Sequence, residues 1–138
     1  MMTRPKLLIV DDDKEFLEEV KEMLTLSGYD IDVAADGFSA LDKARKNKPD
    51  VILVDLKMSP KSGFQIADEL RNAPELSNSA IIAITGFFTE KEHMMLMNMC
   101  GIKKVILKPL RPLNLIATIE FALAHKKQKE EDYIAIAN

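Results

Sequence analysis

The sequence contains one cysteine, Cys100, among its 138 residues and has no long apolar run. A single cysteine excludes a disulfide within the chain and fits a reducing compartment. The longest apolar runs are about five residues, whereas a membrane-spanning helix needs ~20. The first residues also lack the apolar stretch of a signal peptide. We therefore expect a cytoplasmic protein with no membrane segment.

The sequence also lacks an excess of positive charge and a cluster of nitrogen or sulfur metal ligands. Its net charge is −3, whereas nucleic-acid-binding domains favour a basic balance. No third ligand of the zinc type accompanies His93 and His125. A composition of 47% hydrophobic and 30% charged residues is typical of a globular fold, and the length fits one domain.

Five short segments have the residue pattern of β-strands. Four of them, at about 6–10, 51–54, 80–84 and 104–107, are apolar and rich in β-branched residues, as expected for parallel strands buried on both faces. The fifth, at 29–35, alternates apolar and polar residues, which indicates an edge strand with one face in water.

Amphipathic helical segments lie between the strands. Their apolar stripes, at 3.6-residue spacing, begin at Phe16, Phe38, Phe64 and Leu115, and a methionine-rich helix is expected at 90–100. Helix-end signals accompany them: Asp13 as a cap, Gly28 as a terminator, and capping boxes at Ser62–Gln65 and Thr89–Glu92. This alternation predicts a doubly wound α/β fold, a five-stranded parallel sheet with helices on both faces.

Polar residues follow four of the predicted strands. They are Asp11-Asp12-Asp13, Asp55, Thr85-Gly86 and Lys108-Pro109. In doubly wound sheets, ligands bind beyond the carboxyl ends of the strands. We therefore expect these residues to form one pocket, although they are separated by nearly a hundred positions in the sequence.

The residue types in this pocket suit the transfer of a phosphoryl group. Neighbouring carboxylates repel each other unless a cation or a proton intervenes, and an all-oxygen set suits Mg²⁺ or Mn²⁺. Asp55 is the candidate nucleophile, because a carboxylate can form an aspartyl phosphate. The ammonium of Lys108 and the hydroxyl of Thr85 can contact phosphoryl oxygens.

Together, the four motifs resemble the receiver domain of two-component response regulators, over about residues 5–125. The resemblance implies a flavodoxin-like sheet with strand order 2-1-3-4-5, and a signalling switch that is not a conventional enzyme. It also assigns roles to particular residues. Asp11, Asp12, Asp55 and the backbone carbonyl of Lys57 bind Mg²⁺ or Mn²⁺, Asp55 accepts the phosphoryl group, and Thr85 and Lys108 contact it.

Further expectations follow from the same resemblance. A histidine kinase or a histidine phosphotransfer protein donates the phosphoryl group, and an unidentified downstream protein or output domain receives the signal. Phosphorylation is expected to favour a dimer. Residues 1–125 form the receiver domain, and residues 126–138 form a charged tail or truncated linker. A cis bond precedes Pro109, and Gly63 occupies a position where the family usually has glycine.

Two departures from the family pattern keep alternatives open. In Asp55-Leu56-Lys57-Met58-Ser59-Pro60 the proline is displaced by one position, and Val105 replaces a common aromatic residue. A degenerate receiver that only binds a partner is one alternative. The other is a haloacid-dehalogenase-like phosphatase using Asp11 and Asp13, which Glu15 disfavours because that family expects Thr or Val there. The methionines Met94, Met95, Met97 and Met99 fit either core packing or a docking patch.

Overall fold

Five parallel strands form a single sheet in the computed structural model, which describes residues 3–86, 90–95, 102 and 104–137. Side chains are described in these ranges except at residue 93 and residues 127–137. The strands are β1 (Lys6–Val10), β2 (Asp30–Ala34), β3 (Val51–Asp55), β4 (Ala80–Thr85) and β5 (Val105–Leu107). Their order is β2-β1-β3-β4-β5. The predicted sheet and the edge position of β2 are therefore confirmed.

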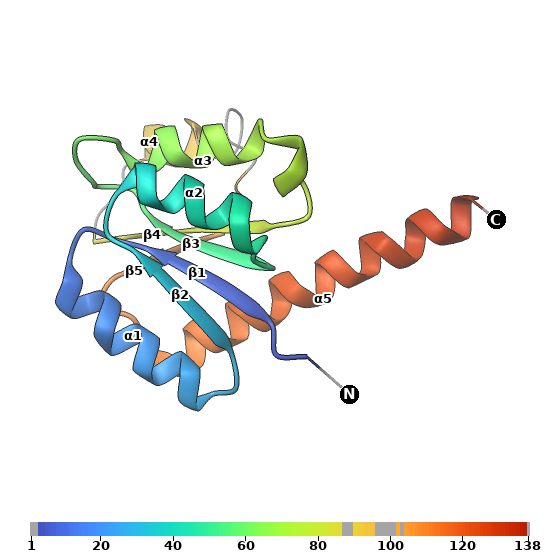
Figure 1. Cartoon of the computed structure of the whole chain (residues 1–138), viewed down its shortest axis with the longest axis horizontal. Coiled ribbons are helices and arrows are strands. Elements are labelled where there is room, and N and C mark those ends of the chain that lie inside the picture. The colour runs from blue at the N-terminus through green and yellow to red at the C-terminus, as the bar shows by residue number, and fades with distance from the viewer. Residues whose placement is uncertain (1–2, 87–89, 96–101, 103, 138) are drawn as a thin grey trace.

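Helices cover both faces of this sheet (Figure 1). They are α1 (Lys14–Leu26), α2 (Gly37–Asn47), α3 (Gly63–Arg71), α4 (Glu90–Met95) and α5 (Pro112–Ala137), with a short 3₁₀ helix, η1, at Pro74–Leu76. One face carries α1 and α5, and the other carries α2, α3 and α4. Thr89, Met97, Met99 and Cys100, which the sequence placed in or beside the fourth helix, lie outside the described residues.

Alternate residues of the central strands fill the two layers of the core. In β1, Leu7 and Ile9 pack with α1 and α5, whereas Leu8 and Val10 pack with α2 and α3. This is the period-two alternation of a strand covered on both faces. All of β3 is buried, so the strand that ends in Asp55 is held from both sides.

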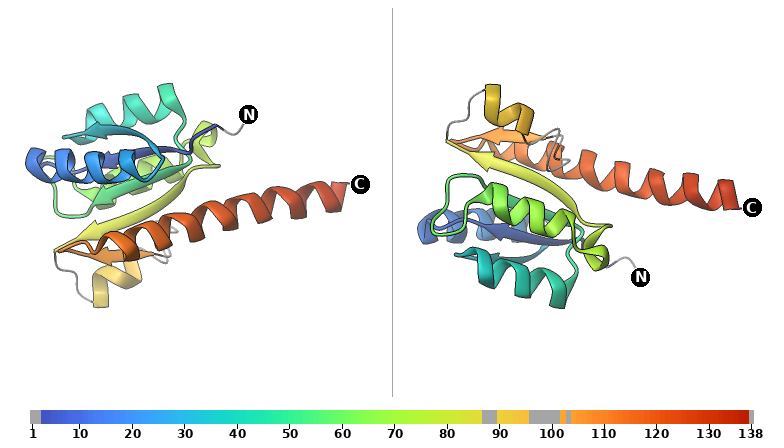
Figure 2. Two further views of the ribbon diagram at one scale, coloured as in Figure 1. Left: turned by 90° about the horizontal axis from the view of Figure 1, so that it is seen from below. Right: turned by 90° about the horizontal axis from the view of Figure 1, so that it is seen from above.

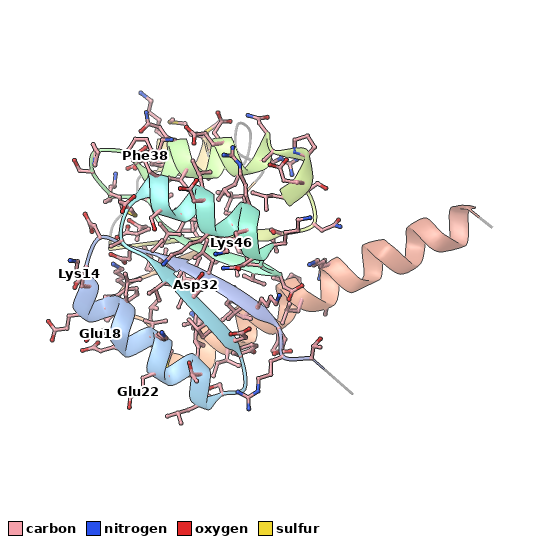
Figure 3. The ribbon with its side chains drawn as sticks, in the orientation of Figure 1. Lys14, Glu18, Glu22, Asp32, Phe38 and Lys46 are labelled. Atoms are coloured by element: carbon pink, nitrogen blue, oxygen red, sulfur yellow. The ribbon has the colours of Figure 1, made fainter. Side chains whose placement is uncertain are left out.

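The helix ends agree with the capping signals in the sequence. Asp13 caps α1, accepting a hydrogen bond from the backbone N–H of Phe16. Ser62 and Gln65 form the predicted capping box of α3, and Gly28 follows α1 with a φ of +99°. Opposite the buried stripe of α1, Lys14, Glu18 and Glu22 point into solvent (Figure 3).

The last helix, α5, is longer than the sheet that it covers. Figure 2 shows it leaving the domain beyond the amino-terminal ends of the strands. Its buried residues Leu115 and Ile119 anchor its first half to the core. Near the point of exit, Lys126 Nζ lies 2.9 Å from Asp50 Oδ1. Among the helices of the described ranges, none is long and apolar enough to cross a membrane.

Candidate functional site

The sheet topology brings the four strand-end motifs to one edge. Asp11 directly follows β1, Asp55 and Thr85 are the last residues of β3 and β4, and Lys108 directly follows β5. Since all the strands are parallel and β3 lies between β1 and β4, Asp55 occupies the centre of this edge. The structure therefore brings these residues together at the carboxyl ends of the strands, as predicted.

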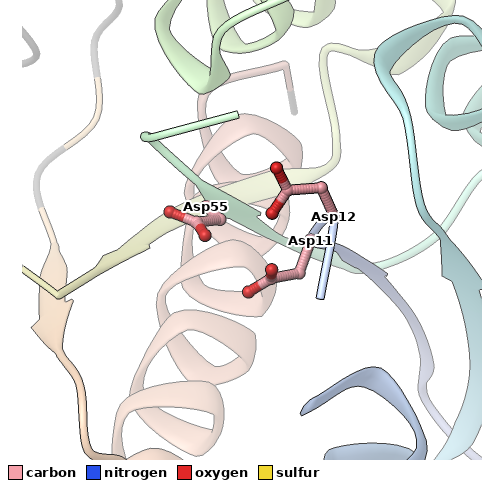
Figure 4. Close-up of side chains that lie close together, drawn as sticks. All are labelled: Asp11, Asp12 and Asp55. Atoms are coloured by element: carbon pink, nitrogen blue, oxygen red, sulfur yellow. The ribbon is translucent and has the colours of Figure 1, made fainter. Parts of the chain in front are cut away.

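Three carboxylates meet at this edge (Figure 4). One oxygen from each of Asp11, Asp12 and Asp55 lies within 4.8 Å of the other two. Asp11 and Asp55 are buried, with exposed fractions of 0% and 6%, whereas Asp12 is exposed. Asp13, by contrast, uses its carboxylate to cap α1. The acidic group therefore has two buried members and one at the solvent side.

Backbone amides hold the two buried carboxylates in place. The N–H of Asp13 donates to Asp11 Oδ1 over 2.9 Å, and the N–H of Lys57 donates to Asp55 Oδ1 over 3.0 Å. Each carboxylate thus accepts from the amide two residues further on, as Asp does in tight turns. One oxygen of each carboxylate is fixed, and the other is directed to the middle of the site.

Lys108 joins the two buried carboxylates. Its Nζ lies 2.6 Å from Asp11 Oδ2 and 3.2 Å from Asp55 Oδ2. Its backbone N–H donates to the carbonyl of Thr85 over 2.8 Å. The peptide bond between Lys108 and Pro109 is cis, as predicted. Lys108, which follows β5, therefore places a positive charge beside the carboxylates at the ends of β1 and β3.

Burial and mutual charge shift the protonation of this group. Burial raises the pKa of Asp11, and the nearby charge of Asp55 raises it further, although hydrogen bonds from Lys108 and Asp13 oppose the shift. Burial would lower the pKa of Lys108, but its hydrogen bond to Asp11 and the charges of both carboxylates raise that pKa instead. The site is thus an acidic group that favours a cation in its centre.

Two further residues, Thr85 and Gly63, pack beside Asp55. Thr85 is fully buried at the end of the strand next to Asp55. Gly63, the first residue of α3, packs so closely on β3 that a Cβ atom there would lie 2.1 Å from the carbonyl oxygen of Asp55. Glycine is therefore required at this position because the backbone of β3 occupies the space of a side chain.

The rim of the site contains contacts that the sequence analysis missed. Lys57 Nζ lies 2.5 Å from Glu92 Oε2 of α4, and the Lys108 ammonium lies 4.1 Å from the centroid of the Phe16 ring. The Ser59–Pro60 bond is cis as well. The helical stripe assigned Phe16 to the core alone, and no local pattern relates Lys57 to a residue 35 positions away.

Comparisons with known proteins agree with this arrangement. The sequence model of one protein family, the response regulator receiver domain, matches residues 7–120. The polar-differentiation response regulator DivK of Brucella anthropi is 29% identical over 114 residues, 83% of this chain and 92% of DivK. The transcriptional regulatory protein PrrA of Mycobacterium tuberculosis is 27% identical over 125 residues, 91% of this chain and 52% of PrrA. The chain thus spans about half the length of PrrA.

A solved structure gives the same result for the fold. The chemotaxis protein CheY4 of Vibrio cholerae aligns with a TM-score of 0.83 and 29% identity, over 88% of this chain and 100% of CheY4. The residues matched by the family model run from β1 into α5 and include all the candidate site residues. The chain therefore belongs to the response regulator receiver domains of two-component signalling.

Proposed function

We propose that Asp55 accepts a phosphoryl group from the phosphohistidine of a histidine kinase or of a histidine phosphotransfer protein. The observation that carries this proposal is the position of Asp55 beside Asp11, Asp12 and Lys108. One oxygen of this carboxylate, Oδ2, lies 3.2 Å from the ammonium of Lys108, so a cation stands beside the candidate nucleophile. Asp55 is also the central residue of the edge where ligands of such folds bind.

In the proposed reaction, a carboxylate oxygen of Asp55 attacks phosphorus, and the phosphorus–nitrogen bond to the donor imidazole breaks. The electron pair of that bond stays on the imidazole nitrogen, which takes a proton as it leaves. The product is an acyl phosphate on Asp55. Lys108 stabilises one phosphoryl oxygen through its ammonium, and Thr85 donates its hydroxyl to another.

The acidic group fits a divalent metal. Asp11, Asp12 and Asp55, together with the backbone carbonyl of Lys57, would hold Mg²⁺, or Mn²⁺, through the oxygen ligands that these ions prefer. The proximity of three carboxylate oxygens, two of them from buried residues, supports this fit. When bound, the metal supplies positive charge that offsets the phosphoryl oxygens in the transition state.

Phosphorylation would then bias a surface that a partner reads. We propose that residues 1–125 form the switch in the cytoplasm, that residues 126–138 lead toward a partner or output domain, and that phosphorylation favours a dimer. The name of PrrA describes a transcriptional regulator, but this chain matches only about half of PrrA. Transcriptional output is therefore a property of that relative and only a candidate here.

The decisive experiment measures the acceptor directly. The purified chain, incubated with Mg²⁺ and a small phosphodonor such as acetyl phosphate, should gain the mass of one phosphate in an acid-labile form. Asp55→Asn should abolish the gain, whereas Asp13→Asn, which retains an oxygen to cap α1, should not. A gain that persists in Asp55→Asn would place the acceptor elsewhere. No gain in the wild type with small donors and with purified kinases would favour the degenerate receiver.

A further inference from the structure

Three groups contact the ammonium of Lys108: the carboxylate that follows β1, the carboxylate that ends β3, and a ring from α1. Asp11 and Asp55 supply carboxylate oxygens at 2.6 and 3.2 Å. The ring of Phe16 lies beneath the ammonium, with its centroid 4.1 Å from Nζ. This distance is well inside the ~6 Å limit for an attractive contact between a cation and the face of an aromatic ring.

We propose that Phe16 is a positioning residue, whose ring holds the Lys108 ammonium at the place where the phosphoryl group arrives. This inference rests on the proposed function, because it assigns Phe16 a part in phosphoryl transfer to Asp55. Phe16 itself need not touch the phosphoryl group. It acts through Lys108, whose long side chain has four rotatable bonds and would otherwise sample many positions.

The local structure fixes the ring relative to the acidic group. Phe16 donates its backbone N–H to Asp13 Oδ1 over 3.2 Å, and its half-buried ring packs against the core between α1, α5 and the sheet. Asp13 in turn donates its N–H to Asp11 Oδ1. One turn of the chain therefore places both the carboxylate and the ring that contact Lys108.

The ring offers something that the two carboxylates cannot offer during the reaction. To contact a phosphoryl oxygen, the ammonium must loosen at least one of its bonds to Asp11 and Asp55. A ring face attracts the cation without an acceptor atom that must be given up, so its attraction persists as the ammonium shifts. Lys108 has an exposed side-chain fraction of only 23%, and partial desolvation strengthens such a contact.

A plain packing role for Phe16 makes different predictions. If the ring only fills space, then a side chain of similar volume and any ring of the same shape should serve equally well. If the ring attracts the cation, the effect should follow the negative charge on the ring face. The chain also offers a matched control, because Lys104 lies 4.7 Å from the centroid of the Phe121 ring on α5. Lys104 precedes β5, whereas Lys108 follows it.

The test compares the wild type with three proteins changed at position 16: Phe16→Leu, Phe16→Tyr, and a fluorinated protein with 3,4,5-trifluorophenylalanine in place of Phe16. Phe121→Leu is the control. Fluorination keeps the shape of the ring while reducing the negative charge on its face. We expect Phe16→Leu and the fluorinated protein to phosphorylate about three- to tenfold more slowly with acetyl phosphate and Mg²⁺. Phe16→Tyr and Phe121→Leu should keep the wild-type rate. Thermal unfolding checks that each variant is folded.

A second readout needs no phosphodonor. NMR relaxation of the Lys108 side chain should show it ordered in the wild type and Phe16→Tyr, and more mobile in Phe16→Leu and the fluorinated protein. Wild-type order and wild-type rate in the fluorinated protein would overturn the positioning role. If the wild type is never phosphorylated but the mobility of Lys108 changes as expected, the proposal that Phe16 positions Lys108 is supported. The proposal that Asp55 accepts a phosphoryl group is then contradicted.

Discussion

Asp11 shows how the charges of the acidic site are balanced. Its carboxylate is fully buried and close to that of Asp55, and burial of an unpaired charge is strongly unfavourable. Lys108 offsets that cost through its 2.6 Å contact with Asp11. Asp12 differs because it is exposed, so its charge costs little and is available to an ion that enters from solvent.

The exposure of Asp12 leads to a prediction about metal affinity. Asp12→Asn removes one negative charge from the group without leaving a buried gap, so the fold should be unchanged. We expect the affinity for Mg²⁺, measured by isothermal titration calorimetry, to fall by about tenfold or more, at least as much as losing an outer-shell partner costs. Asp13→Asn, at the adjacent helix cap, should retain wild-type affinity. Equal affinities in both variants would remove Asp12 from the ligand set.

Gly63 leads to a prediction about stability. In Gly63→Ala the new Cβ would lie 2.1 Å from the carbonyl oxygen of Asp55. The clashing atoms belong to the backbone of Asp55 and Leu56, so β3 or α3 would have to shift. The free energy of unfolding should therefore drop by about 2 kcal/mol or more, seen as a lower midpoint in thermal or urea unfolding. Gly86→Ala is the control, because a Cβ atom there would meet no atom within 4 Å among the described residues, its own chain neighbours apart. Similar midpoints for the two variants would contradict the packing argument.

At the level of residues, the sequence predicted which groups meet but not how they contact each other. Asp11, Asp55, Thr85 and Lys108 could be placed together because each ends or follows a buried parallel strand. The bridge from Lys108 to Asp11 and the ring of Phe16 beneath it depend on side-chain directions that periodicity does not encode. Phe16 belongs to the apolar stripe of α1, packs against the core, and also contacts Lys108.

At the scale of elements, α4 is connected to the rim of the site by an ion pair. Glu92, in its first turn, pairs with Lys57, two residues beyond Asp55, over 2.5 Å. The side chain of Lys57 is half exposed (51%), whereas that of Glu92 is only 18% exposed. This contact links the loop after β3 to α4 directly, without the aromatic residue that Val105 replaces.

Removal of this ion pair should loosen α4. In Glu92→Gln, amide hydrogen exchange of residues 90–95 should be faster by about two- to fivefold, the range that fits a partly exposed ion pair. The control is Glu69→Gln, which removes a pair of similar length, Lys61 Nζ to Glu69 Oε1 at 2.6 Å, from α3. Unchanged exchange of α4 in Glu92→Gln would show that other contacts hold the helix.

The elements themselves could be predicted well because their signals are strong and local. The apolar strands, the capping box at Ser62 and the cap at Asp13 are all found at the expected positions. The short 3₁₀ helix at Pro74–Leu76 was missed, since three residues carry no periodicity. The last strand, β5, begins one residue later than expected, at Val105, although the carbonyl of Lys104 still accepts a hydrogen bond from the N–H of Ala83 in β4 over 3.1 Å.

For the molecule as a whole, Asp50 joins distant parts of the chain at the end opposite the acidic site. It accepts from the backbone N–H of Lys6 at the start of β1 and from Lys126 Nζ on α5, both over 2.9 Å. Burial would raise the pKa of Asp50, but these hydrogen bonds and the charges of both lysines lower it below its usual value of 3.8. Ionised Asp50 therefore stabilises the folded chain.

The lowered pKa of Asp50 sets the direction of a pH effect. Its contribution to stability is fully present above the unfolded-state pKa near 3.8, and it is lost as the pH falls through the lower folded-state pKa. Asp50→Asn should therefore lower the unfolding midpoint near about pH 7 and have almost no effect well below about pH 3. Lys126→Met should show the same trend. A midpoint difference that is constant with pH would exclude a role of the Asp50 charge.

The topology of the whole chain followed from its alternation of strands and helices, together with the family resemblance. The length of α5 was harder to predict, because the charged run from Lys126 to Asp132 fits a solvated helix and a linker equally well. The structure has a continuous helix to Ala137. No local residue pattern identifies the partner of Lys126, Asp50, which lies 76 positions earlier.

The length of α5 also has a mechanical consequence. The helix starts at Pro112, four residues after Lys108, and continues for 11 residues beyond Lys126, which is ~16 Å at the rise of an α-helix. A rigid rod of that length turned by ~10° about Lys126 moves its far end by ~3 Å. A small reorientation that starts beside the acidic group would thus be transmitted along the rigid helix to the opposite end of the molecule.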